Sequence, residues 1–392
     1  MEDAVILSGV RTPVGSFQGA LASMTAPQLG SLAIEAALKA AGVGGADVDE
    51  VYMGNVLGAG LGQAPARQAS IGAGIPDSVP CTTINKVCGS GMKTVMMAAQ
   101  AIKLGDARIM VAGGMESMSN APYLLDKART GYRMGDGTII DSMVHDGLWD
   151  PYNDCHMGTC GDKTAAEFNF SREKLDEFAA ESYKRALDAQ AAGRFSDEIV
   201  PVEIPQRKGD PVVVDTDEEP GRGKPEKLAK LRAAFAKDGV TTAGNASSLN
   251  DGGAAMVLAS ASVAEERGLK PIGRVVAYAG HAQEPEWFTT APAFAIEKLL
   301  EKAGVSVSDV DLFEVNEAFA VVAMVVAQKV GIPHGKLNVN GGAVSIGHPI
   351  GMTGTRLVMT ALHELRRRGG KYAVASPCIG GGEATAILVE AL

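Results

Sequence analysis

A helix-forming segment occurs twice in the chain, as AIEAALKAAGV at residues 33–43 and as AIEKLLEKAGV at residues 295–305. In both copies the apolar residues share one helical face, and a glycine follows at the position that commonly ends a helix. Both copies continue into an acidic turn and an apolar strand, DVDEVY at residues 47–52 and DVDLFE at residues 309–314. This repetition predicts a duplicated α/β unit.

The similarity between the two halves extends beyond this segment. A predicted helix at residues 92–103 precedes a strand at 108–112, just as a predicted helix at 355–368 precedes a strand at 371–375. Short apolar strands complete the two copies, at residues 4–7, 254–259, 274–278 and 384–389. Strands that alternate with helices usually form a mostly parallel sheet covered on both faces. The crevice at the carboxyl ends of its strands is then the expected ligand site.

The residues from 120 to 244 have no counterpart in the second half, and we interpret them as an inserted loop domain that covers the crevice. One long helix is predicted there, from residue 171 to about residue 192. The N-terminal half then comprises residues 1–119 and 245–270, and the C-terminal half comprises residues 271–392. A basic run in the insertion is either an anion site or a solvated face. It contains Arg222, Lys224, Lys227, Lys230, Arg232 and Lys237.

The composition is that of a soluble globular protein, with 392 residues, 46% hydrophobic residues and a formal net charge of -10. This acidic balance argues against nucleic-acid binding, which usually shows a basic footprint. Apolar runs are too short to span a bilayer, and Met1-Glu2-Asp3 lacks the basic start of a secretory signal. We therefore expect no membrane association, a cytoplasmic location and reduced thiols at all five cysteines.

Two of the cysteines lie in glycine-rich turns, Cys88 in NKVCGSG at residues 85–91 and Cys378 in PCIGGGE at residues 377–383. His348 lies between them in the segment GHP. A nucleophilic thiol needs a base and an oxyanion site, and glycine lets backbone N–H groups approach a ligand closely. Because Cys88 directly precedes a predicted helix, we expect the helix N-terminus to lower its pKa. The alternative for both cysteines is a small buried apolar residue.

Four motifs, in this order along the chain, resemble the thiolase family: VCGSGM at 87–92, NEAF at 316–319, GGAVSIGHPIG at 341–351 and CIGGG at 378–382. Two further segments, HMG from residue 156 and NAS from residue 245, are similar to its short-chain branch. The resemblance covers essentially the whole chain. It implies an α/β protein with a duplicated five-layered thiolase-like fold, two similar halves with mixed sheets and an inserted loop domain. The implied activity is reversible condensation of two acetyl-CoA to acetoacetyl-CoA and CoA.

By this resemblance Cys88 is the nucleophile that carries the acetyl group, and His348 takes its proton. Cys378 removes the α-proton of the second acetyl-CoA. The backbone N–H groups of Cys88 and Gly380 would hold the tetrahedral oxyanion, while His348 and a water fixed by Asn316 would hold the enolate oxygen. Asn316 has a second interpretation, compatible with the first, as the N-cap of the helix that follows it.

The resemblance also assigns ten residues to CoA and acyl binding: Leu148, His156, Met157, Arg222, Lys224, Phe235, Ala243, Ser247, Phe288 and Phe319. Among them Arg222 and Lys224 would contact phosphates. The bulky Met157, Phe288 and Phe319 would shorten the acyl pocket and favour acetyl and acetoacetyl groups. The expected partners are acetyl-CoA, acetoacetyl-CoA and CoA as substrates, with no further cofactor, and copies of the same chain in a homotetramer built as a dimer of dimers.

Two other functions stay open at this point. A broad-range degradative 3-ketoacyl-CoA thiolase would share every catalytic residue and differ in pocket size, whereas an acyl-CoA-binding relative would be catalytically silent. We expect no metal site. Cys155-His156 with Cys160 supplies too few ligands at the spacing of a structural zinc site. Pro220 stands where potassium-stimulated thiolases have a tyrosine, which argues against that ion as well.

Overall fold

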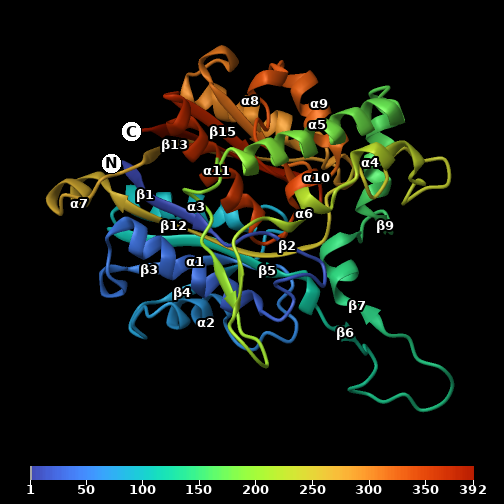
Figure 1. The fold of residues 1–392 in the computed structure, drawn as a ribbon, viewed down its shortest axis with the longest axis horizontal. Helices are drawn as coiled ribbons and strands as arrows, with labels where there is room; N and C mark the ends of the chain where they lie inside the picture. Colours follow the sequence, from blue (N-terminus) through green and yellow to red (C-terminus); the bar gives the residue numbers. More distant parts are fainter. Residues whose placement is uncertain (1) are drawn as a thin grey trace.

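The computed structural model describes residues 2–392, which fold into five layers (Figure 1). The two halves of one continuous sheet enclose a middle layer of helices, and each half is covered by helices on its outer face. Strands of the N-terminal half run across the sheet as β4 (Cys81–Ile84), β3 (Glu50–Gly54), β5 (Ile109–Ser117), β12 (Asn250–Ser260) and β1 (Ala4–Arg11). Strands of the C-terminal half continue it as β13 (Gly273–Ala282), β17 (Glu383–Ala391), β15 (Tyr372–Ser376) and β14 (Leu312–Val315). Two short strands pair at the side, β2 (Gly15–Ser16) with β12 and β16 (Cys378–Ile379) with β17.

The sheet is mixed, so the pattern-based prediction of a mostly parallel sheet is wrong. Only β3 with β4, β3 with β5 and β14 with β15 pair in parallel, and the central strands are antiparallel. The connection from β15 to β17 illustrates the reason. Only residues 377–382 separate these two strands. A loop this short allows an antiparallel return, whereas a parallel neighbour needs a crossover of a dozen or more residues.

Helices fill the other three layers (Figure 1). The outer layer of the N-terminal half contains α1 (Ala26–Ala41) and α2 (Pro65–Gly72), and that of the C-terminal half contains α8 (Ala291–Ala303) and α9 (Ala320–Val330). The middle layer contains α3 (Ser90–Leu104) and α11 (Thr353–Arg368). Shorter pieces connect the layers: η1 (Gly45–Asp47), α7 (Ala261–Glu266), η5 (Pro285–Trp287), η6 (Val307–Asp309), η7 (His334–Lys336) and α10 (Ala343–Ile346). The predicted helices and strands of both repeats are all present.

The two middle helices touch at their N-terminal ends through glycine. A side chain at Gly91 would place its Cβ 2.9 Å from the backbone nitrogen of Thr355, and one at Gly354 would collide with the backbone nitrogen of Met92. Real Cβ atoms do not approach backbone that closely, so only glycine allows this contact. Because α3 follows Cys88 and α11 follows His348, the contact brings the two predicted catalytic segments together.

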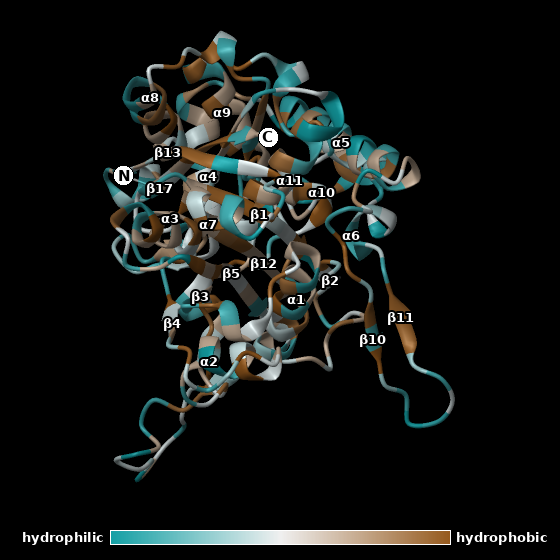
Figure 2. Cartoon of the chain, turned by 90° about the vertical axis from the view of Figure 1, so that its left-hand side faces the viewer, coloured by the Kyte–Doolittle hydropathy of each residue, from teal (hydrophilic) through white to brown (hydrophobic). Residues whose placement is uncertain are grey.

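The segment interpreted as an insertion forms two projecting arms and a compact helical part (Figures 1 and 2). It follows η2 (Met118–Asn120) and contains β6 (Tyr123–Leu124), β7 (Ile140–Asp141), η3 (Met143–Leu148), β8 (Trp149–Asp150), β9 (Cys155–His156), α4 (Met157–Glu167), α5 (Arg172–Ala191), β10 (Val202–Ile204), β11 (Val212–Val214), α6 (Glu218–Arg222) and η4 (Pro225–Lys230). The long helix predicted from residue 171 is α5, with Ser171 as its N-cap, whereas α4 was not anticipated. The domain boundaries themselves stay a prediction.

The core lies between the layers. Strands β1, β5 and β12 are buried along their whole length, and Figure 2 shows hydrophobic residues along the central strands and hydrophilic ones on exposed helix faces. Within residues 2–392 no helix combines the length and hydropathy needed to cross a membrane.

Candidate active site

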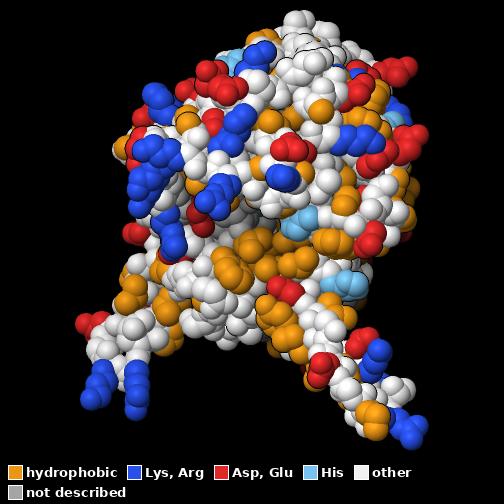
Figure 3. All heavy atoms as spheres, turned by 90° about the vertical axis from the view of Figure 1, so that its right-hand side faces the viewer, with side chains coloured by type: hydrophobic (Ala, Val, Ile, Leu, Met, Phe, Trp, Pro, Cys, Tyr) orange, Lys and Arg blue, Asp and Glu red, His pale blue; other side chains and the backbone are white. Residues whose placement is uncertain are grey.

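A pocket of about 410 Å³ lies where the two halves meet the inserted segment. Figure 3 shows hydrophobic side chains gathered around a hollow on one face of the molecule. Eleven of the fifteen predicted site residues line the pocket: Cys88, Leu148, His156, Met157, Phe235, Ala243, Ser247, Phe288, Phe319, His348 and Gly380. Because residues from both repeats contribute, the pocket exists only when the two halves are packed together.

Cys88 sits in a strained turn before α3. The preceding Val87 has a φ of 46°, a conformation that β-branched residues rarely adopt. Three hydrogen bonds hold this turn: Asn85 Oδ1 accepts from the Val87 N–H at 3.0 Å, and the Val87 carbonyl accepts from the Ser90 N–H at 3.0 Å and from Ser90 Oγ at 2.7 Å. The strained backbone therefore fixes where the thiol lies at the pocket wall.

The surroundings of the Cys88 thiol favour its protonated form. Burial raises its pKa to about 11, and the negative charge of Glu116 acts in the same direction. The backbone N–H groups of Cys88 and Gly380 both donate toward the sulfur and favour the thiolate, but desolvation outweighs them. The expectation of a lowered pKa is therefore wrong, because the cost of desolvating the thiolate exceeds what these two donors return. The thiol needs a base.

His348 has the tautomer and charge state of such a base. Its Nδ1 lies 2.7 Å from Thr353 Oγ1, and that hydroxyl donates to the Pro349 carbonyl at 2.9 Å, so Nδ1 carries the proton and Nε2 is the acceptor. Asn250 Oδ1 accepts from the His348 backbone N–H at 2.8 Å and fixes the turn. Burial, together with the positive charge of Arg356, lowers the imidazole pKa to about 3. The ring is neutral at physiological pH.

Asn316 lies beside this imidazole. Its Nδ2 donates to His348 Nε2 at 3.3 Å, and its backbone N–H donates to the Ser376 carbonyl at 3.1 Å, at the carboxyl ends of β14 and β15. Its Oδ1 is buried without a hydrogen-bond partner among the described residues. The N-cap interpretation is wrong, because α9 begins at Ala320 and the cap position is Phe319. The free carbonyl oxygen points to a ligand role instead.

Cys378 is fully buried and does not line the pocket, but it lies close to Cys88. It pairs with Ala384 in the ladder between β16 and β17. Burial raises the pKa of its thiol well above the usual value, and a charge on Cys88 raises it further. The backbone N–H of Ala318 donates toward the Cys378 sulfur. The structure thus brings both predicted thiols to one place, with Cys378 behind the pocket wall.

A row of four rings forms one wall of the pocket. His156 stacks on Phe235 with centroids 4.5 Å apart, Phe235 meets Phe319 edge to face at 5.9 Å, and Phe319 meets Phe288 at 6.4 Å. The row depends on Gly158, because a Cβ there would collide with the Phe235 ring. Such packed aromatic pairs are rigid and stabilising, and this wall limits the length of any acyl group beside it.

The predicted phosphate contacts of Arg222 and Lys224 stay a prediction. Arg222 and Lys224 are exposed and do not line the pocket, and the nearest acidic partner of Arg222 is Glu218 at 4.0 Å. Conversely, several lining residues were not predicted: Val87, Met118, Met143, Val144, Gly147, Ala234, Ala246, Ser248, Leu249, Ala318 and Ile350. Most are small or apolar residues with no chemical signature in the sequence. The one signal for Val87 and Ala318 was that they lie inside two of the quoted motifs.

Glu116 is a further polar residue that sequence reasoning missed. The backbone N–H groups of Val56, Leu57 and Gly351 donate to its carboxylate at 3.0–3.2 Å, and Asn55 Nδ2 donates at 2.8 Å. Burial raises its pKa to about 7. Through Gly351 this carboxylate ties the loop that follows His348 to the N-terminal half.

Comparison with known proteins gives the family. Sequence models of the thiolase N-terminal domain and the thiolase C-terminal domain match residues 4–262 and 269–391. The chain belongs to the thiolase family. This thiolase is 54% identical over 392 residues to acetyl-CoA acetyltransferase 2 of Arabidopsis thaliana, which covers 100% of this chain and 97% of the relative. It is 52% identical over 391 residues to acetyl-CoA acetyltransferase of Cupriavidus necator, with full coverage of both chains.

A solved thiolase structure agrees with this assignment. The Acat5 thiolase from Ascaris suum, crystallised in complex with coenzyme A, matches this thiolase with a TM-score of 0.95 at 44% identity, covering 100% of both chains. The family and the duplicated thiolase fold predicted from the four motifs are confirmed.

Proposed function

We propose that this thiolase is an acetyl-CoA C-acetyltransferase, which condenses two acetyl-CoA to acetoacetyl-CoA and CoA and also catalyses the reverse thiolysis. One observation carries the proposal: the Cys88 thiol shares a pocket with His348, whose hydrogen bonds leave Nε2 as an acceptor. Relatives that are 54% and 52% identical over essentially their whole length bear the name acetyl-CoA acetyltransferase. The acyl group would be carried as a thioester on Cys88.

In the first half-reaction His348 Nε2 takes the proton of Cys88, whose sulfur attacks the carbonyl carbon of acetyl-CoA. The resulting oxyanion lies beside the backbone N–H groups of Cys88 and Gly380, which already point toward this sulfur. When the C–S bond to CoA breaks, Cys378 donates its proton to the departing CoA sulfur. Acetyl-Cys88, a protonated imidazole and a Cys378 thiolate are left.

In the second half-reaction the Cys378 thiolate removes an α-proton from a second acetyl-CoA. A thiol whose pKa is raised by burial gives a strongly basic thiolate, which suits the removal of a weakly acidic proton. The enolate oxygen is held by the protonated His348 and by a water bound to Asn316. The enolate carbon attacks acetyl-Cys88, the C–S bond breaks, and the Cys88 sulfur recovers the proton from His348. Acetoacetyl-CoA leaves, and every group returns to its starting state.

The short acyl range is proposed from the aromatic wall. Phe288 and Phe319 pack against each other at 6.4 Å, and Met157 lies on the same pocket lining. We expect kcat/KM for acetoacetyl-CoA to exceed that for a 3-ketoacyl-CoA of about eight carbons by at least about 10-fold, since each buried methylene that does not fit costs about 1–3 kcal/mol. Equal values would instead identify a broad-range degradative thiolase.

Mixing with radiolabelled acetyl-CoA tests the chemistry directly. We expect one label per chain, located on the Cys88 peptide, and its transfer to acetoacetyl-CoA when more acetyl-CoA is added. A folded protein that never becomes labelled, yet binds acetyl-CoA, would be the catalytically silent relative. No cofactor beyond the CoA thioesters is proposed for this cycle, because each proton is supplied by Cys88, His348 or Cys378.

We also propose a homotetramer in the cytoplasm. The arm between η2 and η3 exposes several large hydrophobic side chains, and exposed apolar groups of this kind are typical of association surfaces. They are Tyr123, Leu125, Met134 and Ile139. The molecular mass in solution, measured by light scattering, should be that of four chains. A variant in which these four residues are replaced by serine should dissociate while retaining the Cys88 label.

A further inference from the structure

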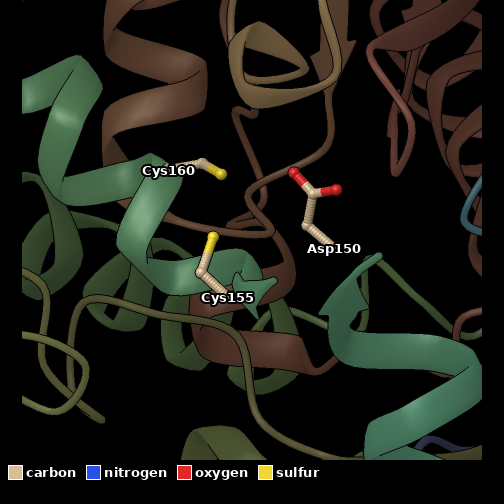
Figure 4. Close-up of side chains that lie close together, drawn as sticks. All are labelled: Asp150, Cys155 and Cys160. Atoms are coloured by element: carbon tan, nitrogen blue, oxygen red, sulfur yellow. The ribbon is translucent and has the colours of Figure 1, made fainter. Parts of the chain in front are cut away.

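A second pair of cysteines lies beside the pocket with a buried carboxylate. Asp150 and Cys155 face each other across the short hairpin of β8 and β9, and Cys160 approaches them from the first turn of α4 (Figure 4). The carboxylate oxygen and both sulfurs all lie within 4.8 Å of one another. Directly paired residues of a ladder project to the same side of the strands, which explains why Asp150 and Cys155 meet.

The carboxylate is held in a fixed orientation. Asp150 Oδ1 accepts from the Tyr152 N–H at 2.9 Å, and Oδ2 accepts from Asn153 Nδ2 at 2.8 Å. Oδ1 also accepts from the Asn153 N–H at 3.4 Å. All three bonds come from the hairpin loop, and one of the two carboxylate oxygens faces the two cysteines (Figure 4). Carboxylates that bind metal ions are typically oriented by hydrogen bonds of this kind. The side chain is 2% exposed, so its position does not depend on solvent.

Other groups near the cluster already have partners. His156, between the two cysteines in sequence, accepts from the Gly158 N–H through Nδ1 at 3.1 Å and stacks on Phe235, so it belongs to the pocket. The Lys163 ammonium pairs with Glu286 at 2.6 Å and therefore does not neutralise the cluster. Two thiols and one carboxylate thus face one another without a protein cation among the described residues that would pair with all three.

We propose that Asp150, Cys155 and Cys160 bind a soft divalent cation of the Zn²⁺ type. Thiolate ligands select zinc-like ions over calcium or magnesium. Zinc–sulfur bonds of about 2.3 Å in a tetrahedral site place two sulfurs about 3.8 Å apart. Because the ligand atoms already lie within 4.8 Å of one another, the two sulfurs need to approach by at most about 1 Å. The two thiols lose their protons to solvent on binding. Three protein ligands leave a fourth position for water or another small ligand.

The sequence alone argued against such a site because it showed only Cys155, His156 and Cys160. The fold replaces the histidine by Asp150, which lies five residues before Cys155 and reaches it through the hairpin. The two segments that carry the sulfurs also carry His156 and Met157, which line the pocket. An ion bound here would stabilise the segments that form this pocket wall and would not contact the reacting atoms.

The test measures Co²⁺ and Zn²⁺ binding to the reduced full-length protein. A C88A/C378A background removes the two thiols of the active site, so that any thiolate signal comes from elsewhere. We expect one equivalent of Co²⁺ with sulfur-to-cobalt charge-transfer absorption, displaced by one equivalent of Zn²⁺. Any disulfide between Cys155 and Cys160 is reduced before the measurement. If the reduced protein shows no such absorption, the proposal is overturned.

Variants then locate the site. In the same background, C155S and C160S should each weaken binding by at least about 100-fold and lose the charge-transfer band, while D150N should weaken it about 10- to 100-fold. C81S is the matched control, because Cys81 is another half-buried thiol, on β4, and should change nothing. Binding that survives the C155S/C160S pair, or that C81S abolishes, overturns the assignment. Thermal unfolding of each variant without metal confirms that the fold is retained.

Discussion

The two halves of the molecule carry the same elements, but they use the carboxyl ends of their strands differently. In the N-terminal half, Asn55 follows β3 and Glu116 lies near the end of β5, and the two are joined by a 2.8 Å hydrogen bond. In the C-terminal half, Asn316 follows β14 and Cys378 follows β15, and Asn316 Oδ1 has no partner among the described residues. In the N-terminal half, Asn55 and Glu116 hold the strand ends together, and we call this pair the brace. In the C-terminal half, the strand ends present groups that can react.

The starts of the two middle helices show the same division. Cys88 precedes α3 and His348 precedes α11, so each half supplies one member of the proposed proton-transfer pair. The brace in the N-terminal half reaches across to the other half, since Glu116 accepts from the Gly351 N–H. We therefore expect substitutions of Asn316, Cys378 or His348 to reduce turnover. Substitutions in the brace should instead reduce the free energy of unfolding.

The largest expected effect belongs to the nucleophile. C88S should abolish acetyl labelling and lower turnover by at least about 10⁴-fold, because loss of a catalytic nucleophile removes the covalent route altogether. Labelling with radioactive acetyl-CoA and steady-state kinetics measure both quantities. Circular dichroism serves as the control for folding. A C88S protein that still turns over at a tenth of the original rate would refute the acetyl-enzyme.

Loss of the second thiol should separate the two half-reactions. C378A should retain the Cys88 label but lower condensation by about 10²–10⁴-fold, the usual contribution of a general acid or base. The measurement is a single-turnover experiment that follows label on the enzyme and in acetoacetyl-CoA. Cys378 is fully buried, so a smaller side chain there leaves a cavity. Cys378→Ser, which nearly conserves the size of the side chain, is therefore a second variant. Full turnover in either variant contradicts the division of labour between the two thiols.

The two asparagines at equivalent strand ends provide a matched pair. N316A should lower kcat by about 10²–10³-fold, as expected for the loss of an oxyanion donor, here the water that Asn316 would hold, with little change in melting temperature. N55A should lower the free energy of unfolding by about 1–3 kcal/mol, because it removes one of the four donors to Glu116 and the side-chain donor to the Met115 carbonyl, and should change kcat far less. Denaturant unfolding and kinetics on both variants check this. Identical behaviour of the two variants would remove the distinction between the halves.

The pH dependence of thiol alkylation sharpens the comparison between Cys88 and His348. With burial raising the Cys88 pKa to about 11 and lowering the His348 pKa to about 3, neither group ionises between these values. Iodoacetamide alkylation of Cys88 in C378A protein should therefore rise about tenfold per pH unit from about pH 6 to pH 9. Mass spectrometry of the Cys88 peptide measures the rate, with free CoA as the reference thiol. A plateau above pH 7 would show a preformed ion pair instead.

Much of this site was predictable because its chemistry has a sequence signature. The glycine-flanked cysteines and the GHP segment identified Cys88, Cys378 and His348, and the repeat placed them on equivalent elements. The raised pKa of Cys88 was not predictable, since burial is a property of the packed halves. Glu116 escaped notice for the same reason: a single glutamate near the end of a strand has no pattern, and its four donors come from distant segments.

The inserted segment shows the other limit of sequence reasoning. Its long helix α5 was predictable from an amphipathic pattern with a serine cap, whereas α4 is short and begins at a histidine cap. The Asp150 cluster depends on a hairpin with two-residue strands, too short to leave an alternating pattern. Tertiary contacts rather than local propensity determine such pieces.

The smallest effect is expected at the basic run of the insertion. Arg222 and Lys224 are exposed and do not line the pocket, so R222A and K224A should each change KM for acetyl-CoA by less than about threefold, as is usual for charges at the rim of a site. Phe235, which does line the pocket, gives the contrast: F235A removes the centre of the aromatic row and should raise KM by at least about tenfold. Measuring KM at two salt concentrations separates long-range electrostatic effects, which salt screens, from direct contacts with CoA. If R222A raises KM as much as F235A does, Arg222 contacts CoA, and the CoA site extends beyond the pocket.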